Sequence, residues 1–157
     1  MMASPKVDHQ EIVGFVYTEL KIYLKGKKCR AFIAPLDVVL FEKDEESDDS
    51  QNVFQPDVFV ICDPEKIADE RIYGAPDFVV EVISPGTAAN DYSNKRNLYM
   101  QHGVKEYWVI NPDMKNILIH INGEKVQTCS HTFNDKIKVS IFGDLKIDFK
   151  DLDIKGE

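Results

Sequence analysis

The segment at residues 75–84 constrains the fold more than any other part of the chain. It reads Ala-Pro-Asp-Phe-Val-Val-Glu-Val-Ile-Ser, so one carboxylate, Glu81, interrupts an apolar run rich in β-branched residues. Such a run predicts a buried strand. A charge inside a buried strand is costly unless it is paired or coordinates a metal. The sequence therefore requires that the fold bring a partner to Glu81.

A second segment of similar wording supplies a candidate partner. Residues 55–61 read Gln-Pro-Asp-Val-Phe-Val-Ile and place Asp57 at the start of another predicted strand. If the two strands are neighbours, Asp57 and Glu81 offer two hard oxygen ligands to one ion, which suits Mg²⁺-assisted phosphodiester chemistry. A structural alternative stays open, because an arginine or a backbone amide can also satisfy a buried carboxylate.

Composition limits the class of protein. A chain of 157 residues is expected to form a single domain over 1–157, and no apolar stretch is long enough for a membrane span. The net charge of −8 argues against a protein whose whole surface attracts nucleic acid. Much of the excess negative charge lies in an acidic run at 44–49, which predicts a solvated loop. Lysine and arginine are denser at 21–30 and 95–105, where they form either a local phosphate-binding face or an ordinary solvated surface.

Cysteine usage favours a reducing compartment. Cys29, Cys62 and Cys129 are widely spaced in apolar, strand-like contexts, which predicts reduced, buried thiols and neither a disulfide frame nor a zinc site. The N-terminus lacks the pattern of a signal peptide. Together these features predict a cytoplasmic location.

The order of predicted elements indicates an α/β fold. Helical spacing predicts helices over 8–25 and from Asn90 or Asp91 to about 102, and Trp108 and Tyr107 are expected in the core. The predicted strands cover 29–34, 37–41, 57–62, 77–84, 104–110, 117–121 and 125–129, with edge strands in the tail at 137–149. We expect a mixed, largely antiparallel sheet with two main helices packed against it.

The second helix carries a candidate cation. Alternation along residues 77–84 places Asp77 and Glu81 on one face of the strand, and Tyr92, Lys95 and Tyr99 follow one stripe of the helix. Lys95 can either extend outward into solvent or reach the carboxylate pair and stabilise phosphate charge.

The residues at 74–87 and 103–112, with Asp91, Lys95 and Leu98-Tyr99 between them, closely resemble the Uma family of putative restriction endonucleases, within the PD-(D/E)XK nuclease superfamily. The resemblance covers nearly the whole chain and implies a restriction-endonuclease-like fold, DNA as substrate, and Mg²⁺ (or Mn²⁺) held by Asp57 and Glu81. The superfamily's lysine would fall at position 83, where this chain has Ile83. Lys95 is the candidate replacement, so the implied catalytic residues are Asp57, Glu81 and Lys95.

Further polar residues are candidates for support around that site. His9 and Gln10 open the first helix, Asp77 is either a second metal ligand or a turn residue that opens its strand, and Ser84 is expected to shape the turn that follows. Asp91 is a candidate cap of the second helix.

The resemblance also implies that the chain starts late. Family members usually begin with a further helix and β-hairpin, so Met1–Pro5 is expected to be the end of that hairpin. Without the rest of the hairpin one edge of the sheet would be exposed. Because exposed edges recruit partners, the chain is expected to form a homo-oligomer.

The leading function is therefore a metal-dependent endonuclease that hydrolyses DNA phosphodiester bonds. An inactive nuclease-like binding or assembly module, and more weakly an unrelated domain with paired buried acids, are the alternatives.

Overall fold

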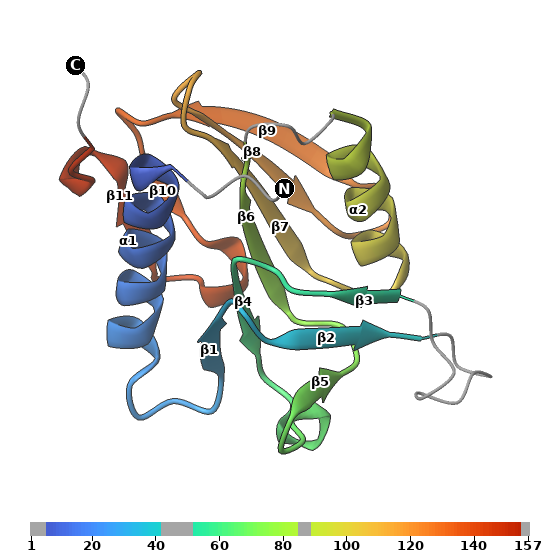
Figure 1. Cartoon of the computed structure of the whole chain (residues 1–157). Coiled ribbons are helices and arrows are strands. Elements are labelled where there is room, and N and C mark those ends of the chain that lie inside the picture. Colours follow the sequence, from blue (N-terminus) through green and yellow to red (C-terminus); the bar gives the residue numbers. More distant parts are fainter. Residues whose placement is uncertain (1–5, 42–51, 85–88, 155–157) are drawn as a thin grey trace.

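The computed structural model describes residues 6–41, 52–84 and 89–154 (Figure 1). At its centre is a six-stranded sheet with the order β1-β4-β6-β7-β8-β9. These strands are β1 (Arg30–Ile33), β4 (Val58–Ile61), β6 (Phe78–Val82), β7 (Glu106–Asn111), β8 (Asn116–Ile121) and β9 (Gln127–Thr132). Strands β6 and β7 run parallel and are joined through α2 (Ala89–Gln101), and the other neighbours in this sheet are antiparallel. The predicted fold class, a mixed and largely antiparallel sheet with two helices, is confirmed.

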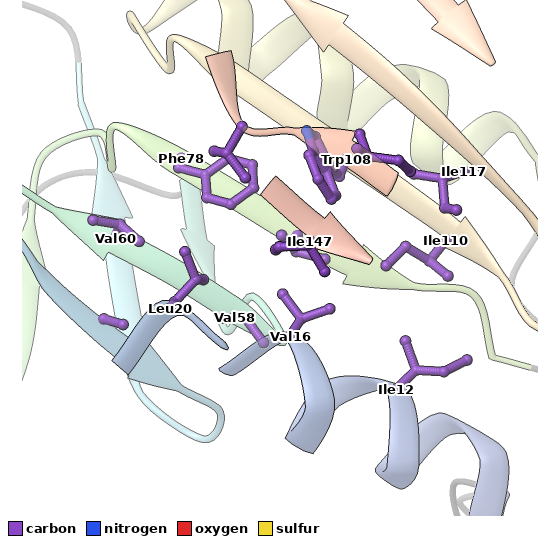
Figure 2. Close-up of a cluster of buried hydrophobic side chains, with 14 of the residues drawn as sticks. Ile12, Val16, Leu20, Val58, Val60, Phe78, Trp108, Ile110, Ile117 and Ile147 are labelled. Carbon is purple, nitrogen blue, oxygen red and sulfur yellow. The ribbon is translucent and has the colours of Figure 1, made fainter. Parts of the chain in front are cut away.

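The two helices lie on opposite sides of this sheet, as Figure 1 shows. Helix α1 (Val7–Leu24) buries Ile12, Val16 and Leu20, which are spaced four residues apart and so share one helix face. Figure 2 shows these side chains directed toward Phe78 and Trp108 of the sheet.

Alternation along β6 divides its side chains between the two helices. Phe78, Val80 and Val82 belong to the cluster under α1, whereas Val79 lies in the cluster under α2 with Tyr99. The predicted alternation is confirmed, and it places Glu81 on the side of α2.

A small sheet completes the core on the α2 side. It has the order β3-β2-β5 and consists of β2 (Asp37–Leu40), β3 (Asn52–Phe54) and β5 (Arg71–Tyr73). Val38, Leu40 and Ile72 fill the cluster that contains Tyr99. The sequence did not predict β3 and β5, because strands of three residues carry too little periodicity to identify.

The tail does not extend the main sheet. Strands β10 (Lys136–Lys138) and β11 (Lys146–Asp148) pair with each other and pack Ile137 and Ile147 onto the cluster under α1. The prediction of edge strands at 137–149 is therefore wrong in its pairing. Short 3-10 turns lie at η2 (Pro64–Lys66), η3 (Ser140–Phe142) and η4 (Phe149–Asp151).

The prediction for the cysteines is also wrong. Arg30 pairs with Ile61 across β1 and β4, so Cys29 and Cys62 lie opposite each other just beyond that pair and form a disulfide. Cys129 is free but exposed on β9. Both outcomes depend on the register of strands far apart in the sequence, which local context does not reveal.

A buried acid that the sequence did not single out joins the tail to the core. Glu106, at the start of β7, is fully buried and accepts hydrogen bonds from Trp108 Nε1 at 2.7 Å and from the Ile141 amide at 3.2 Å. Burial raises the pKa of Glu106, although these hydrogen bonds act in the opposite direction. Trp108 and Tyr107 are fully buried, which confirms their predicted place in the core.

Two expectations fall outside the described residues, namely the acidic run at 44–49 and the N-terminal segment Met1–Pro5. Over the part of the chain that the structure does describe, no helix is both long and apolar enough to cross a membrane.

Candidate active site

Asp57 and Glu81 lie at the same end of neighbouring strands. Val58 pairs with Val80 across β4 and β6, so one further step in this register sets Asp57 opposite Glu81. The backbone amide of Val82 donates to Asp57 Oδ2 at 2.8 Å, which ties the start of β4 to the end of β6. The predicted adjacency of the two acids is confirmed.

Glu81 receives two hydrogen bonds from α2. Its carboxylate is 4% exposed, Tyr99 donates its hydroxyl to Oε1 at 2.8 Å, and Lys95 Nζ donates to Oε2 at 2.8 Å. Lys95 and Tyr99 are four residues apart, so consecutive turns of α2 present both donors to the same carboxylate. Of the two alternatives for Lys95, solvent or the carboxylate pair, the structure shows the second, and its side chain remains 30% exposed.

The charges of this group are strongly coupled. Burial raises the pKa of Glu81, the ammonium of Lys95 and the hydroxyl of Tyr99 act against that rise, and the charge of Asp57 adds to it. Burial is therefore the largest cause of the raised pKa of Glu81, and repulsion from Asp57 is a smaller one.

Lys95 remains a cation in this setting. Burial alone lowers its pKa, yet the charge of Glu81 and the hydrogen bond to it outweigh that effect, so the net pKa is raised. Burial and the charge of Glu81 also raise the pKa of Tyr99, so its hydroxyl stays protonated and acts as a donor.

His9 approaches Asp57 from α1. Its Nε2 atom lies 3.5 Å from Asp57 Oδ2, and its ring is buried. Nδ1 of His9 is also buried and has no hydrogen-bond partner among the described residues. Gln10, the next residue, is exposed and lines a hollow on the outer side of α1 with Glu11 and Phe15, so the structure does not bring it to the acids.

The other candidates lie apart from the acid pair. Asp77 precedes β6 at the opposite end of that strand, where it accepts from the Cys62 amide at 2.9 Å and pairs with Lys105 Nζ at 3.2 Å. It therefore serves the turn that opens the strand. Ser84 is half-buried just after β6, and Asp91 is exposed in the first turn of α2.

The group resembles a metal site with two protein ligands. Within residues 6–41, 52–84 and 89–154, no group of three or more His, Cys, Asp or Glu side chains is arranged to hold a metal. In the same ranges the hydrogen bonds to the Asp57 carboxylate reach Oδ2, which leaves Oδ1 available to a cation. A cation that also binds Glu81 must share or displace the hydrogen bonds from Lys95 and Tyr99.

Tyr99 is the residue whose role the sequence missed. It was placed on the same helix stripe as Lys95, but no function followed from that position. The spacing of four residues after Lys95 was the available signal, because any donor there faces the same carboxylate.

Comparison with solved structures identifies a protein that shares the fold of this chain. A solved structure of the same fold is the crystal structure of a putative nuclease belonging to DUF820 from Anabaena variabilis ATCC 29413, with a TM-score of 0.74 and 19% sequence identity. The match covers 96% of this chain and 82% of that chain.

The chain belongs to the Uma2 family, described as putative restriction endonuclease, whose sequence model matches residues 1–150. The resemblance inferred from the sequence is thus confirmed. A search of curated proteins found no match.

Proposed function

We propose that this protein is a metal-dependent endonuclease that hydrolyses DNA phosphodiester bonds. The observation that carries the proposal is the convergence of Asp57, Glu81 and Lys95 from β4, β6 and α2 on one end of the sheet. Two acids and a cation are the parts that phosphodiester hydrolysis needs. Membership of the Uma2 family supports DNA as the substrate.

Asp57 and Glu81 are the residues that would hold Mg²⁺, or Mn²⁺ in its place. When bound, such an ion polarises a phosphoryl oxygen and lowers the pKa of a bound water. The carboxylate of Asp57 is held by the Val82 amide and by His9, so it is oriented before an ion arrives.

Lys95 has two roles in this proposal. Its ammonium offsets the burial of Glu81, which keeps that carboxylate more acidic than burial alone would leave it. Because the Lys95 side chain is still 30% exposed, it can also contact a phosphate that approaches from solvent. Ile83 occupies the position of the superfamily's lysine, so Lys95 supplies the charge from the next element.

One observation favours the alternative of an inactive binding or assembly module. Both oxygens of Glu81 already accept hydrogen bonds, from Tyr99 and from Lys95. If those bonds hold against a divalent ion, the acid pair has a structural role and the protein binds its partner without cleaving it.

A cleavage assay separates the two functions. We expect the protein to nick supercoiled plasmid DNA in Mg²⁺ or Mn²⁺, and we expect Glu81→Gln and Lys95→Met to lose at least about 100-fold in rate, since each removes a charge from the reacting centre. The matched control is Glu124→Gln, which changes an exposed glutamate of the β8–β9 hairpin and should leave the rate unchanged.

Calorimetric titration with Mn²⁺ then identifies the cause of a negative result. No Mn²⁺ binding and no cleavage would support the inactive module, in which Tyr99 and Lys95 hold Glu81 against an ion. Binding that is lost in Glu81→Gln, without DNA cleavage, would retain the metal site and contradict hydrolysis by it. Self-association, expected from the sheet edge, stays a prediction for sedimentation velocity to test.

A further inference from the structure

A groove runs beside the candidate active site, between α2 and the outer strands β8 and β9. It consists of two hollows of about 230 and 330 Å³ that both include Arg96 in their linings. On the helix side the wall is formed by Tyr92, Arg96 and Met100, which are spaced four residues apart. The eight steps from Tyr92 to Met100 along α2 span about 12 Å at about 1.5 Å per residue.

The floor of the groove is sheet surface that α2 leaves uncovered. Val109 of β7 pairs with Leu118 of β8, and Tyr107 pairs with His120, so Leu118 and His120 lie on the side of α2. Leu118 is 39% exposed, whereas His120 is buried. The groove therefore has an exposed leucine in its floor and Arg96 in its helix wall.

The groove lies beside the candidate active site. Lys95 and Tyr99 of α2 face Glu81, and the adjacent stripe of the same helix faces the groove. The ring of Tyr92 lines the groove, and its centroid is 5.7 Å from Lys95 Nζ. Ile83, two residues after Glu81, lines the groove as well.

The charge of the lining selects among possible occupants. Among the described residues that line the two hollows, Arg96 is a cation and none is a carboxylate. This is notable in a chain of net charge −8. An aromatic ring, a guanidinium and an exposed leucine suit planar bases and their phosphates, because bases stack on aromatic groups while the guanidinium binds the phosphate.

We propose that this groove binds an unpaired stretch of DNA strand next to the scissile phosphodiester, with Arg96 contacting its phosphates. The inference rests on the proposed nuclease function and adds a substrate class to it, namely DNA with a single-stranded flank, such as a fork or flap. Tyr92 flanks the bases, and Leu118 lies beneath them.

Binding to labelled DNA tests this inference separately from catalysis. Fluorescence anisotropy is measured in Ca²⁺, with a forked duplex that has a single-stranded thymidine flank and with a blunt duplex of equal length. We expect the wild-type protein to bind the fork about tenfold more tightly, as one stacked base and one phosphate contact allow. Arg96→Glu should reduce this ratio to near one, whereas Lys138→Glu, an equal charge reversal at an exposed lysine of β10, should preserve it.

Each outcome of the binding experiment leads to one conclusion about the groove. No preference in the wild-type protein, or a preference that survives Arg96→Glu, would overturn the groove as a strand-binding site even if cleavage is observed. A preference that depends on Arg96 in a protein without cleavage would retain the groove and refute the hydrolytic function.

Crosslinking of the wild-type protein gives a test that needs no variant. An iodouracil base in the flank should crosslink to the peptide that contains Tyr92. Crosslinks confined to other elements, α1 or β10 for example, would overturn the proposal.

Discussion

Removal of the Lys95 ammonium is the perturbation with the most specific expected result. Lys95→Met keeps most of the aliphatic side chain and deletes the group that donates to Glu81 Oε2 at 2.8 Å. Glu81 is 4% exposed, so its carboxylate loses the cation that offsets its burial. The hydrogen bond from Tyr99 remains.

The expected magnitude lies between two known limits. Breaking a fully buried ion pair costs about 3–5 kcal/mol, whereas an exposed pair contributes about 0–1 kcal/mol. The Lys95 side chain is 30% exposed, so solvent screens part of the interaction. We therefore expect Lys95→Met to lower the free energy of unfolding by about 1–2 kcal/mol at pH 8, in the range of a hydrogen bond to a charged group.

The pH dependence of this loss follows from the direction of the pKa shift. The pKa of Glu81 is higher in the folded state than in the unfolded state, so ionisation of Glu81 destabilises the fold. This loss of stability is complete above the folded-state pKa and absent below the unfolded-state pKa. Lys95→Met raises the folded pKa further, because the charge and hydrogen bond that lowered it are gone. The variant should therefore lose more stability at pH 8 than at pH 5. Lys95 itself is protonated at both values, since its own pKa is raised.

Urea unfolding at pH 5 and pH 8 measures both quantities. A double-mutant cycle with Glu81→Gln isolates the pairwise energy, and Lys138→Met is the control for loss of an exposed lysine. Equal losses at the two pH values, or a coupling energy within the error of additivity of about 0.3–0.5 kcal/mol, would refute the reasoning.

Three further predictions concern metal binding, the buried acid of β7 and the disulfide. Affinity for Mn²⁺ in calorimetry should rise with pH, because burial raises the pKa of Glu81 and the ion must displace its proton; a pH-independent affinity would argue against this ligand. The fluorescence of Trp108, the single tryptophan, should change with pH above the usual glutamate range, as Glu106 ionises, and the free energy of unfolding should fall as pH rises through the same range. Glu106→Gln should abolish this change in fluorescence, and an unchanged pH profile in that variant would contradict the assignment to Glu106. Cys29→Ser should lower the free energy of unfolding by about 2–4 kcal/mol in urea, since the disulfide to Cys62 closes a separation of 33 residues, and no loss would show that the two thiols are not linked in solution.

Local sequence determined the elements that carry the site. The apolar run around Glu81 and the spacing of α1 specified a buried strand and an amphipathic helix, because side-chain periodicity acts within a few residues. The alternation along β6 and the spacing on α2 left Lys95 two alternatives, solvent or the carboxylate pair, and the resemblance to the family favoured the second, which the structure shows. The similar wording of two strand segments offered Asp57 as the partner acid, and the register of β4 against β6 agrees.

The tertiary structure alone decided the features that depend on pairing between distant segments. The disulfide between Cys29 and Cys62 follows from the register of β1 against β4, and the burial of Glu106 follows from the packing of the tail over β7. The pairing of β10 with β11, apart from the main sheet, is of the same kind. Strand register and side-chain packing depend on contacts between segments far apart in the chain, so a short stretch of sequence does not determine them. The need for a partner at a buried carboxylate can be inferred from local sequence, because burying an unpaired charge is costly.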